Sequence, residues 1–215
     1  MSFPALTNAY SGSDVTADSA ANQVIYSSVV NTIFNVEDLT PSVFSVALSR
    51  AASADNAFGG VLAMGGMPSL TDPEVNVATT VVNVAMASPS FDYTVAIGGI
   101  LASGGALADA GGLYLVDTGT SFLYTTAAVA ADIAAGFGPA AQLDTASGTY
   151  VTTCTATAPP VVVSIGGQGF PINPVDLLAG DVGNATALCA ITVGVGGDSK
   201  TLGGTFLMNV LSIFD

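Results

Sequence analysis

The chain has 215 residues, half of them apolar and only 8% charged, so it is long enough to bury a sizeable core within one domain. Only Arg50 and Lys200 are cationic, and the formal charge of -14 at pH 7 argues against nucleic acid or an anionic membrane as a partner, because binding phosphate needs clustered Lys and Arg. Histidine is absent, which excludes Ser-His-Asp and Cys-His catalysis and most zinc sites. Among the common hydrolytic groups only carboxylates remain. A protein that catalyses no reaction is the alternative.

The first half of the chain predicts one helix followed by strands. A helix is expected at 21–34, where apolar residues recur every three or four positions. Strands are expected at 41–48, 58–66, 75–86 and 91–101, with the last two forming an antiparallel pair. Gly98-Gly99 and Gly104-Gly105 are followed by neither a lysine nor a helix start, so they predict no nucleotide site, and no cofactor is expected.

A single carboxylate then stands between a strand and a tight turn. The residues Leu113 to Val116 are typical of a buried strand, and Asp117 follows them directly. The next four residues, Thr118-Gly119-Thr120-Ser121, favour a turn because glycine tolerates unusual φ values and hydroxyls can bond the backbone nearby. A carboxylate in this place is either a structural cap that accepts backbone N–H bonds or a catalytic group.

The second half of the chain alternates helices and strands with glycine-rich turns. Helices are expected at 125–137, where Val129, Ile133 and Phe137 have helical spacing, and in a short form at 171–178. Strands are expected at 148–154 and, as a hairpin, at 161–170.

The string Val116-Asp-Thr-Gly-Thr-Ser121, followed by Phe122-Leu123, resembles the second active-site motif of the pepsin-like aspartic peptidases. The hairpin at 41–66 and the C-terminal segment 201–215 also resemble signatures of this family. The resemblance implies an all-β chain with a few short helices and the pepsin-like acid-protease fold. The chain would form one lobe of its bilobal, β-barrel-like architecture.

By this resemblance Asp117 is the catalytic carboxylate of the second lobe. Thr118 would donate to the bond that crosses between the two active-site turns, and Thr120 would donate to the outer oxygen of Asp117, with Gly119 and Ser121 completing the turn. Leu202-Gly203 would thread beneath that turn. Gly204 and Met208 depart from the family pattern, which usually has Asp and Arg there, and the lost polar partners predict lower local rigidity.

The resemblance runs from Phe3 to Asp215 but covers only the second lobe, so residues 1–215 are expected to be that lobe, without the first lobe and the final strand. No other Asp-Thr-Gly or Asp-Ser-Gly occurs, and one Asp cannot form a dyad that shares a proton. The chain is therefore expected to be one part of an aspartic endopeptidase acting on polypeptides, inactive without its first lobe. Two alternatives are a non-catalytic binding module of the same family and a homodimer in which two copies of Asp117 meet.

Cys154 and Cys189 form the only internal cysteine pair available, and their spacing fits the usual disulfide of the family's second lobe; two buried free thiols are the alternative. Asn184-Ala-Thr186 is an acceptor sequence for N-glycosylation. Together with the acidic, lysine-poor composition, these features predict a secreted or vacuolar protein. The residues after Met1 lack the pattern of a signal peptide, and no apolar stretch is long enough for a transmembrane helix.

Overall fold

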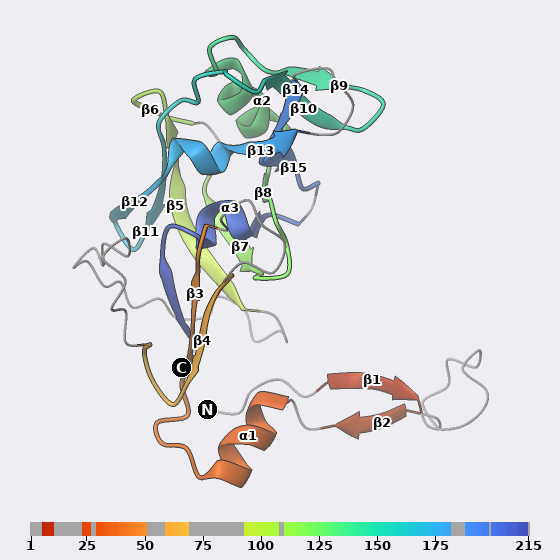
Figure 1. Cartoon of the computed structure of the whole chain (residues 1–215), viewed down its shortest axis with the longest axis vertical. Helices are drawn as coiled ribbons and strands as arrows, with labels where there is room; N and C mark the ends of the chain where they lie inside the picture. Colours follow the sequence, from red (N-terminus) through yellow and green to blue (C-terminus); the bar gives the residue numbers. More distant parts are fainter. Residues whose placement is uncertain are drawn as a thin grey trace. The chain divides into compact units, whose positions relative to one another are not determined.

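The computed structural model describes residues 6–10, 23–26, 29–50, 59–68, 93–107, 110–181, 188–197 and 199–214. The chain divides into two compact units. The first consists of Met1–Val46, Val61–Ser69 and Ile213–Asp215, and the second of Ala47–Gly60 and Leu70–Ser212. The described part is mostly β-strand with a few short helices, which confirms the predicted fold class (Figure 1).

The predicted helix at 21–34 is wrong in its first half. Residues Gln23–Tyr26 form strand β2, which pairs antiparallel with β1 (Leu6–Tyr10), and helix α1 covers Val29–Glu37. Val24, Ile25 and Tyr26 are β-branched or aromatic residues, which favour strands. Their apolar spacing suits a helix equally well, and the presence of a partner strand decides for the sheet.

Two of the strands expected early in the chain are present but shorter than expected. They are β3 (Phe44–Leu48) and β4 (Gly60–Met64), and β3 lies between β4 and the C-terminal β17 (Leu211–Phe214). Within the first unit the rings of Phe44 and Phe214 stack with centroids 4.6 Å apart. The expected strand at 75–86 lies outside the described residues, as does its expected pairing.

The second unit contains the largest sheet, which carries the candidate site. Its strands, in spatial order, are β12 (Gln168–Ile172), β11 (Val161–Ile165), β5 (Thr94–Ala102), β7 (Gly112–Val116), β16 (Thr201–Leu202), β8 (Leu123–Thr125) and β15 (Val193–Val195), with β6 (Gly105–Ala106) beside β5. The strands expected at 91–101, 113–116 and 161–170 are thereby confirmed, but the expected burial of 113–116 is only partly correct, because Leu113 is exposed and Tyr114 alone is fully buried. Over the described residues this sheet is open and does not close into a barrel.

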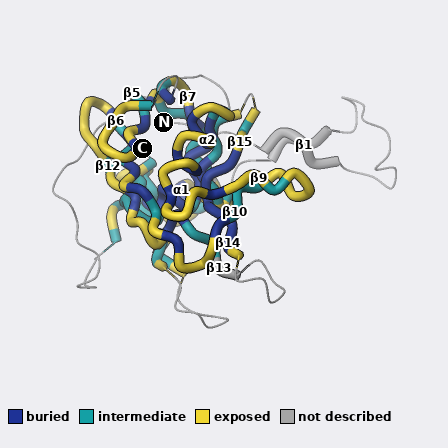
Figure 2. The backbone as a smooth tube through the Cα atoms, turned by 90° about the horizontal axis from the view of Figure 1, so that it is seen from above, coloured by how far each residue is buried: buried dark blue, intermediate teal, exposed yellow. Residues whose placement is uncertain are grey.

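Helix α2 (Ala127–Ala135) covers part of this sheet and helps to bury its core. The side chain of Thr126 caps the helix by accepting from the amide of Val129 at 3.3 Å. Val129, Ile133 and Phe137 are all buried, as their spacing predicts. Along α2 two exposed residues are followed by two buried ones and the pattern repeats, as expected for a helix with one buried face (Figure 2).

Tyr114 holds β7 in place from inside the core. Its side chain is fully buried, and its hydroxyl donates to the carbonyl of Ala110 at 3.0 Å and shares a hydrogen bond of 2.8 Å with the hydroxyl of Thr125 on β8. Burial raises the pKa of Tyr114, and the bond with Thr125 opposes this increase. The phenol therefore stays neutral at physiological pH and links the two strands on either side of the candidate turn.

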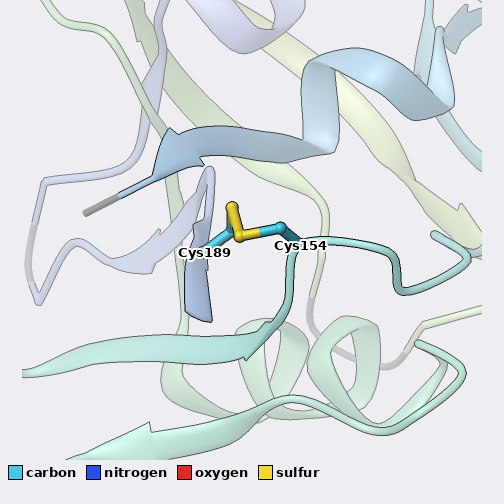
Figure 3. The surroundings of a disulfide bond; sticks show 2 residues. All are labelled: Cys154 and Cys189. Carbon is cyan, nitrogen blue, oxygen red and sulfur yellow. A yellow bond between two sulfur atoms is a disulfide. The ribbon is translucent and has the colours of Figure 1, made fainter. Parts of the chain in front are cut away.

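A second sheet of this unit carries the disulfide. Its strands are β13 (Leu178–Asp181), β14 (Leu188–Ile191), β10 (Thr149–Thr153) and β9 (Gln142–Asp144), and the short helix η2 (Pro174–Leu177) precedes β13. Cys154, just after β10, is bonded to Cys189 on β14 (Figure 3). This confirms the predicted pair and rules out free thiols, whereas Asn184 of the glycosylation sequence lies outside the described residues.

We expect loss of the disulfide to lower the stability of the second unit. The bond closes a loop of 35 residues, so replacing both Cys154 and Cys189 by Ala should lower the free energy of unfolding by about 4 kcal/mol through the greater entropy of the unfolded chain. Urea unfolding of the oxidised protein and of the variant measures the difference. Reducing agent should destabilise the native protein and leave the variant unchanged. Equal stability of the oxidised native protein and the variant would contradict the prediction.

Of the helices in the described ranges, none has both the length and the apolar character that spanning a membrane requires.

Candidate active site

Asp117 lies where the central strand β7 ends. Strand β16 runs parallel to β7 on one side, with Leu202 opposite Val116, and the amide of Asp117 donates to the carbonyl of Leu202 at 3.2 Å. On the other side β7 pairs antiparallel with β5. The backbone of Asp117 is therefore fixed by the middle of the sheet, while its side chain is only half-buried.

The turn after Asp117 supplies one hydrogen-bond donor to each oxygen of its carboxylate. The amide of Gly119 donates to Oδ1 at 2.9 Å, and the hydroxyl of Thr120 donates to Oδ2 at 2.5 Å. Thr118, Gly119 and Ser121 are exposed, whereas Thr120 is half-buried. The carboxylate is thus held in one orientation, and each oxygen can accept a further bond from water or a ligand.

Gly203 and the short helix α3 (Gly204–Leu207) support this turn from below. The amide of Gly204 donates to the carbonyl of Thr120 at 2.7 Å, and the amide of Thr205 donates to that of Ser121 at 2.9 Å. A Cβ added to Gly203 would stand 2.4 Å from the oxygen of Thr120 and 2.3 Å from that of Phe122, so only glycine fits. The structure therefore brings Leu202 and Gly203 together with residues 117–121.

These bonds alone fit both interpretations of Asp117. The bond from Gly119 is one that a capping Asp makes in a turn, and a catalytic carboxylate also needs such orientation. Among the described residues, no group of three or more His, Cys, Asp or Glu gathers in a way that could hold a metal ion. The chemistry that this site offers is that of an oriented, half-buried carboxylate.

Sequence reasoning missed a polar cluster in the same unit. Arg50 donates to both oxygens of Asp176, from Nε at 2.8 and 3.1 Å and from Nη2 at 2.6 Å, and Asn209 donates to Asp176 at 2.9 Å. Both Arg50 and Asp176 line an open pocket of about 400 Å³ that also has Ser121 and Thr205 in its wall. The one available signal was that Arg50 is one of only two cations in the chain.

Gly204 and Met208, the two residues that depart from the family pattern, lie at the start and just past the end of helix α3. The amide of Met208 donates to the carbonyl of Gly204 at 3.0 Å, and the side chain of Asn209 donates to that of Thr205 at 3.0 Å. Backbone bonds and Asn209 thus hold this segment where the side chains at 204 and 208 offer no polar partner.

Comparison with known proteins gives this geometry a context. The model of the family "Eukaryotic aspartyl protease" matches residues 10–215. A probable aspartic-type endopeptidase of Aspergillus fumigatus is 35% identical over 203 residues, which cover 89% of this chain and 46% of that protein. An aspartic protease of Phaffia rhodozyma is 34% identical over 129 residues, covering 57% of this chain and 32% of that protein.

A probable aspartic-type endopeptidase of Arthroderma benhamiae is 31% identical over 128 residues, which cover 58% of this chain and 24% of that protein. The chain therefore spans less than half the length of each of these three relatives.

Proposed function

The chain belongs to the eukaryotic aspartyl protease family, and from this premise we propose that it supplies Asp117 as one of the two catalytic carboxylates of an aspartic endopeptidase. The observation that carries the proposal is the fixed carboxylate at the end of β7. Each of its oxygens has one donor from the turn and remains open to another partner. This arrangement stands in a chain that the family model matches from residue 10 to residue 215.

The proposed chemistry needs a second carboxylate close to Asp117. Two carboxylates about 3 Å apart share one proton, because both cannot be ionised at that distance. The ionised group takes a proton from a water molecule, whose oxygen attacks the peptide carbonyl carbon. The protonated group donates to the carbonyl oxygen, and protonation of the amide nitrogen then allows the carbon–nitrogen bond to break. Polypeptides are the proposed substrates.

The residues around Asp117 have separate proposed roles in this reaction. Gly119 and Thr120 hold the two oxygens in place, so that little reorganisation is needed when the charge changes. Leu202 and Gly203 keep the turn against the sheet. Thr118 is exposed beside Asp117, which suits its proposed bond to the turn that carries the second carboxylate.

We further propose that residues 1–215 are the second lobe of this peptidase and that the first lobe supplies the other carboxylate. The sequence contains one Asp-Thr-Gly and no Asp-Ser-Gly. The share of the Aspergillus relative that the chain covers, 46%, is consistent with one of two lobes of similar size. The disulfide and the glycosylation sequence at Asn184 support a secreted or vacuolar location, because disulfides persist in oxidising compartments.

Adding a first lobe tests the proposal. We expect the chain alone to leave an acid-denatured protein uncleaved at about pH 4, near the ordinary pKa of carboxyl groups. The same chain joined to the residues that its gene encodes upstream should cleave it, and those residues should contain a second Asp-Thr-Gly or Asp-Ser-Gly. Release of peptides measures the reaction. Cleavage by the chain alone, rising with the square of its concentration, would favour the homodimer instead.

A further inference from the structure

A buried carboxylate that the proposed reaction does not use lies within the second unit. Only 4% of the Asp176 side chain is exposed, and it forms an ion pair with Arg50, whose side chain is 43% exposed. A buried charge is costly unless it is paired and hydrogen-bonded. The two nitrogens of Arg50 and the amide of Asn209 meet this requirement.

Asn209 uses the full bonding capacity of its side-chain amide. Its oxygen accepts from Arg50 Nη2 at 2.6 Å and from the amide of Asn173 at 3.0 Å. Its nitrogen donates to Asp176 at 2.9 Å and to the carbonyl of Thr205 at 3.0 Å. Two accepted and two donated bonds are the most that this group can make, so its orientation is determined on every side.

Thr205 connects this cluster to the turn that carries Asp117. Its carbonyl accepts the bond from Asn209, which satisfies a group that the end of a helix would otherwise leave free. Its amide donates to the carbonyl of Ser121 at 2.9 Å, and its hydroxyl lies 3.1 Å from that carbonyl and 3.1 Å from the carbonyl of Thr192. Ser121 ends the turn that begins at Asp117. The backbone amide of Thr205 is therefore bonded to this turn, and its carbonyl is bonded to Asn209.

We infer that Asn209, oriented by Arg50 and Asp176, is a positioning residue for the Asp117 turn and acts on it through Thr205. No hydrogen bond recorded among the described residues joins these three side chains to the carboxylate of Asp117, so they act by fixing backbone. Any effect of this positioning on catalysis rests on the proposed function. The hydrogen bonds themselves do not depend on that function, so they can be tested on the chain alone.

Two amide signals of the folded chain report this role. Exchange of the Gly204 and Thr205 amides with deuterium measures how often α3 separates from the turn, and the proton shift of the Gly119 amide reports its bond to Asp117. Asn209→Asp removes both donated bonds and places a second carboxylate against Asp176. We expect the two amides to exchange about tenfold faster and the Gly119 signal to move, because Thr205 loses the bond from Asn209 and Asp176 loses a donor.

The controls separate positioning from general stability. Asp144→Asn changes a partly exposed carboxylate on β9 in the other sheet, hydrogen-bonded to Ser147, and should alter neither signal. Amides of β11 within the large sheet should keep their exchange rate in Asn209→Asp. Equal acceleration in β11 and at Gly204 and Thr205 would show a merely structural role and overturn the inference.

A second pair of variants covers the case in which Asn209→Asp does not fold. Thr205→Val removes the hydroxyl between Ser121 and Thr192 and keeps the side-chain shape, and Thr205→Ser keeps the hydroxyl. We expect the Val variant to move the Gly119 signal and the Ser variant to restore it. An unmoved Gly119 signal in Thr205→Val would overturn the link to the turn, whatever the chain does in a cleavage assay.

Discussion

Asp117→Asn should lower kcat/KM for an acid-denatured protein by about 10²- to 10⁴-fold in the proposed peptidase, in which a first lobe supplies the second carboxylate. The amide has nearly the same shape as the carboxylate but can neither share a proton with a second carboxyl group nor take one from water. The effect should fall on kcat, because the group acts on the reacting atoms while substrate binding uses other contacts.

The fold should survive this substitution. The carbonyl oxygen of Asn can still accept from Gly119, and the hydroxyl of Thr120 can rotate to accept from the new NH2 group. Peptide release at acid pH measures activity, and urea unfolding confirms that the variant is folded. Asp132→Asn, at an exposed position on α2, is the matched control and should keep full activity. Retained activity in Asp117→Asn with a normal unfolding curve would refute the catalytic assignment.

Gly203→Ala should cost about 3 kcal/mol of unfolding free energy, because the added methyl group would overlap two backbone oxygens. The backbone of Gly203 has φ -95°, which any residue adopts, so the constraint is space. The new Cβ would stand 2.3 Å from the oxygen of Phe122 and 2.4 Å from that of Thr120. Both atoms belong to backbone beside the sheet, so they cannot rotate away as a side chain would.

Gly105→Ala provides the control for that loss. An added Cβ at Gly105 meets no atom within 4 Å, so the change should stay within about 0.5 kcal/mol. Urea unfolding of both variants gives the comparison, and in the assembled peptidase Gly203→Ala should also reduce activity because the turn must move. If both variants unfold alike, Gly203 does not support the turn as closely as its contacts indicate.

Local patterns predicted the parts of this fold in which neighbouring residues decide the conformation. Helix α2 is one, because the spacing of Val129 and Ile133 places both on its buried face, although the helix ends before Phe137. The strand and turn around Asp117 are another, since the Gly119 amide and the Thr120 hydroxyl that orient the carboxylate lie within three positions of it. The cysteine pair could be named because the chain has no other cysteine.

Other features depend on which segments meet in space. Residues 23–26 have a spacing that suits a helix as well as a strand, and their pairing with β1 decides for the strand. Arg50 and Asp176 are 126 positions apart, and nothing near either residue indicates the other. The proposed role of Asn209 likewise depends on the packing of α3 against the turn.

The sequence by itself therefore determined the strand-rich class of this chain, its family and the residue that we propose as catalytic, because each depends on periodicity or on a short contiguous motif. Only the tertiary structure decided how that residue is supported: which glycine has no room for a side chain, and which buried charge is paired. Those properties arise from close contact between segments far apart in the chain, and no local pattern records such contact.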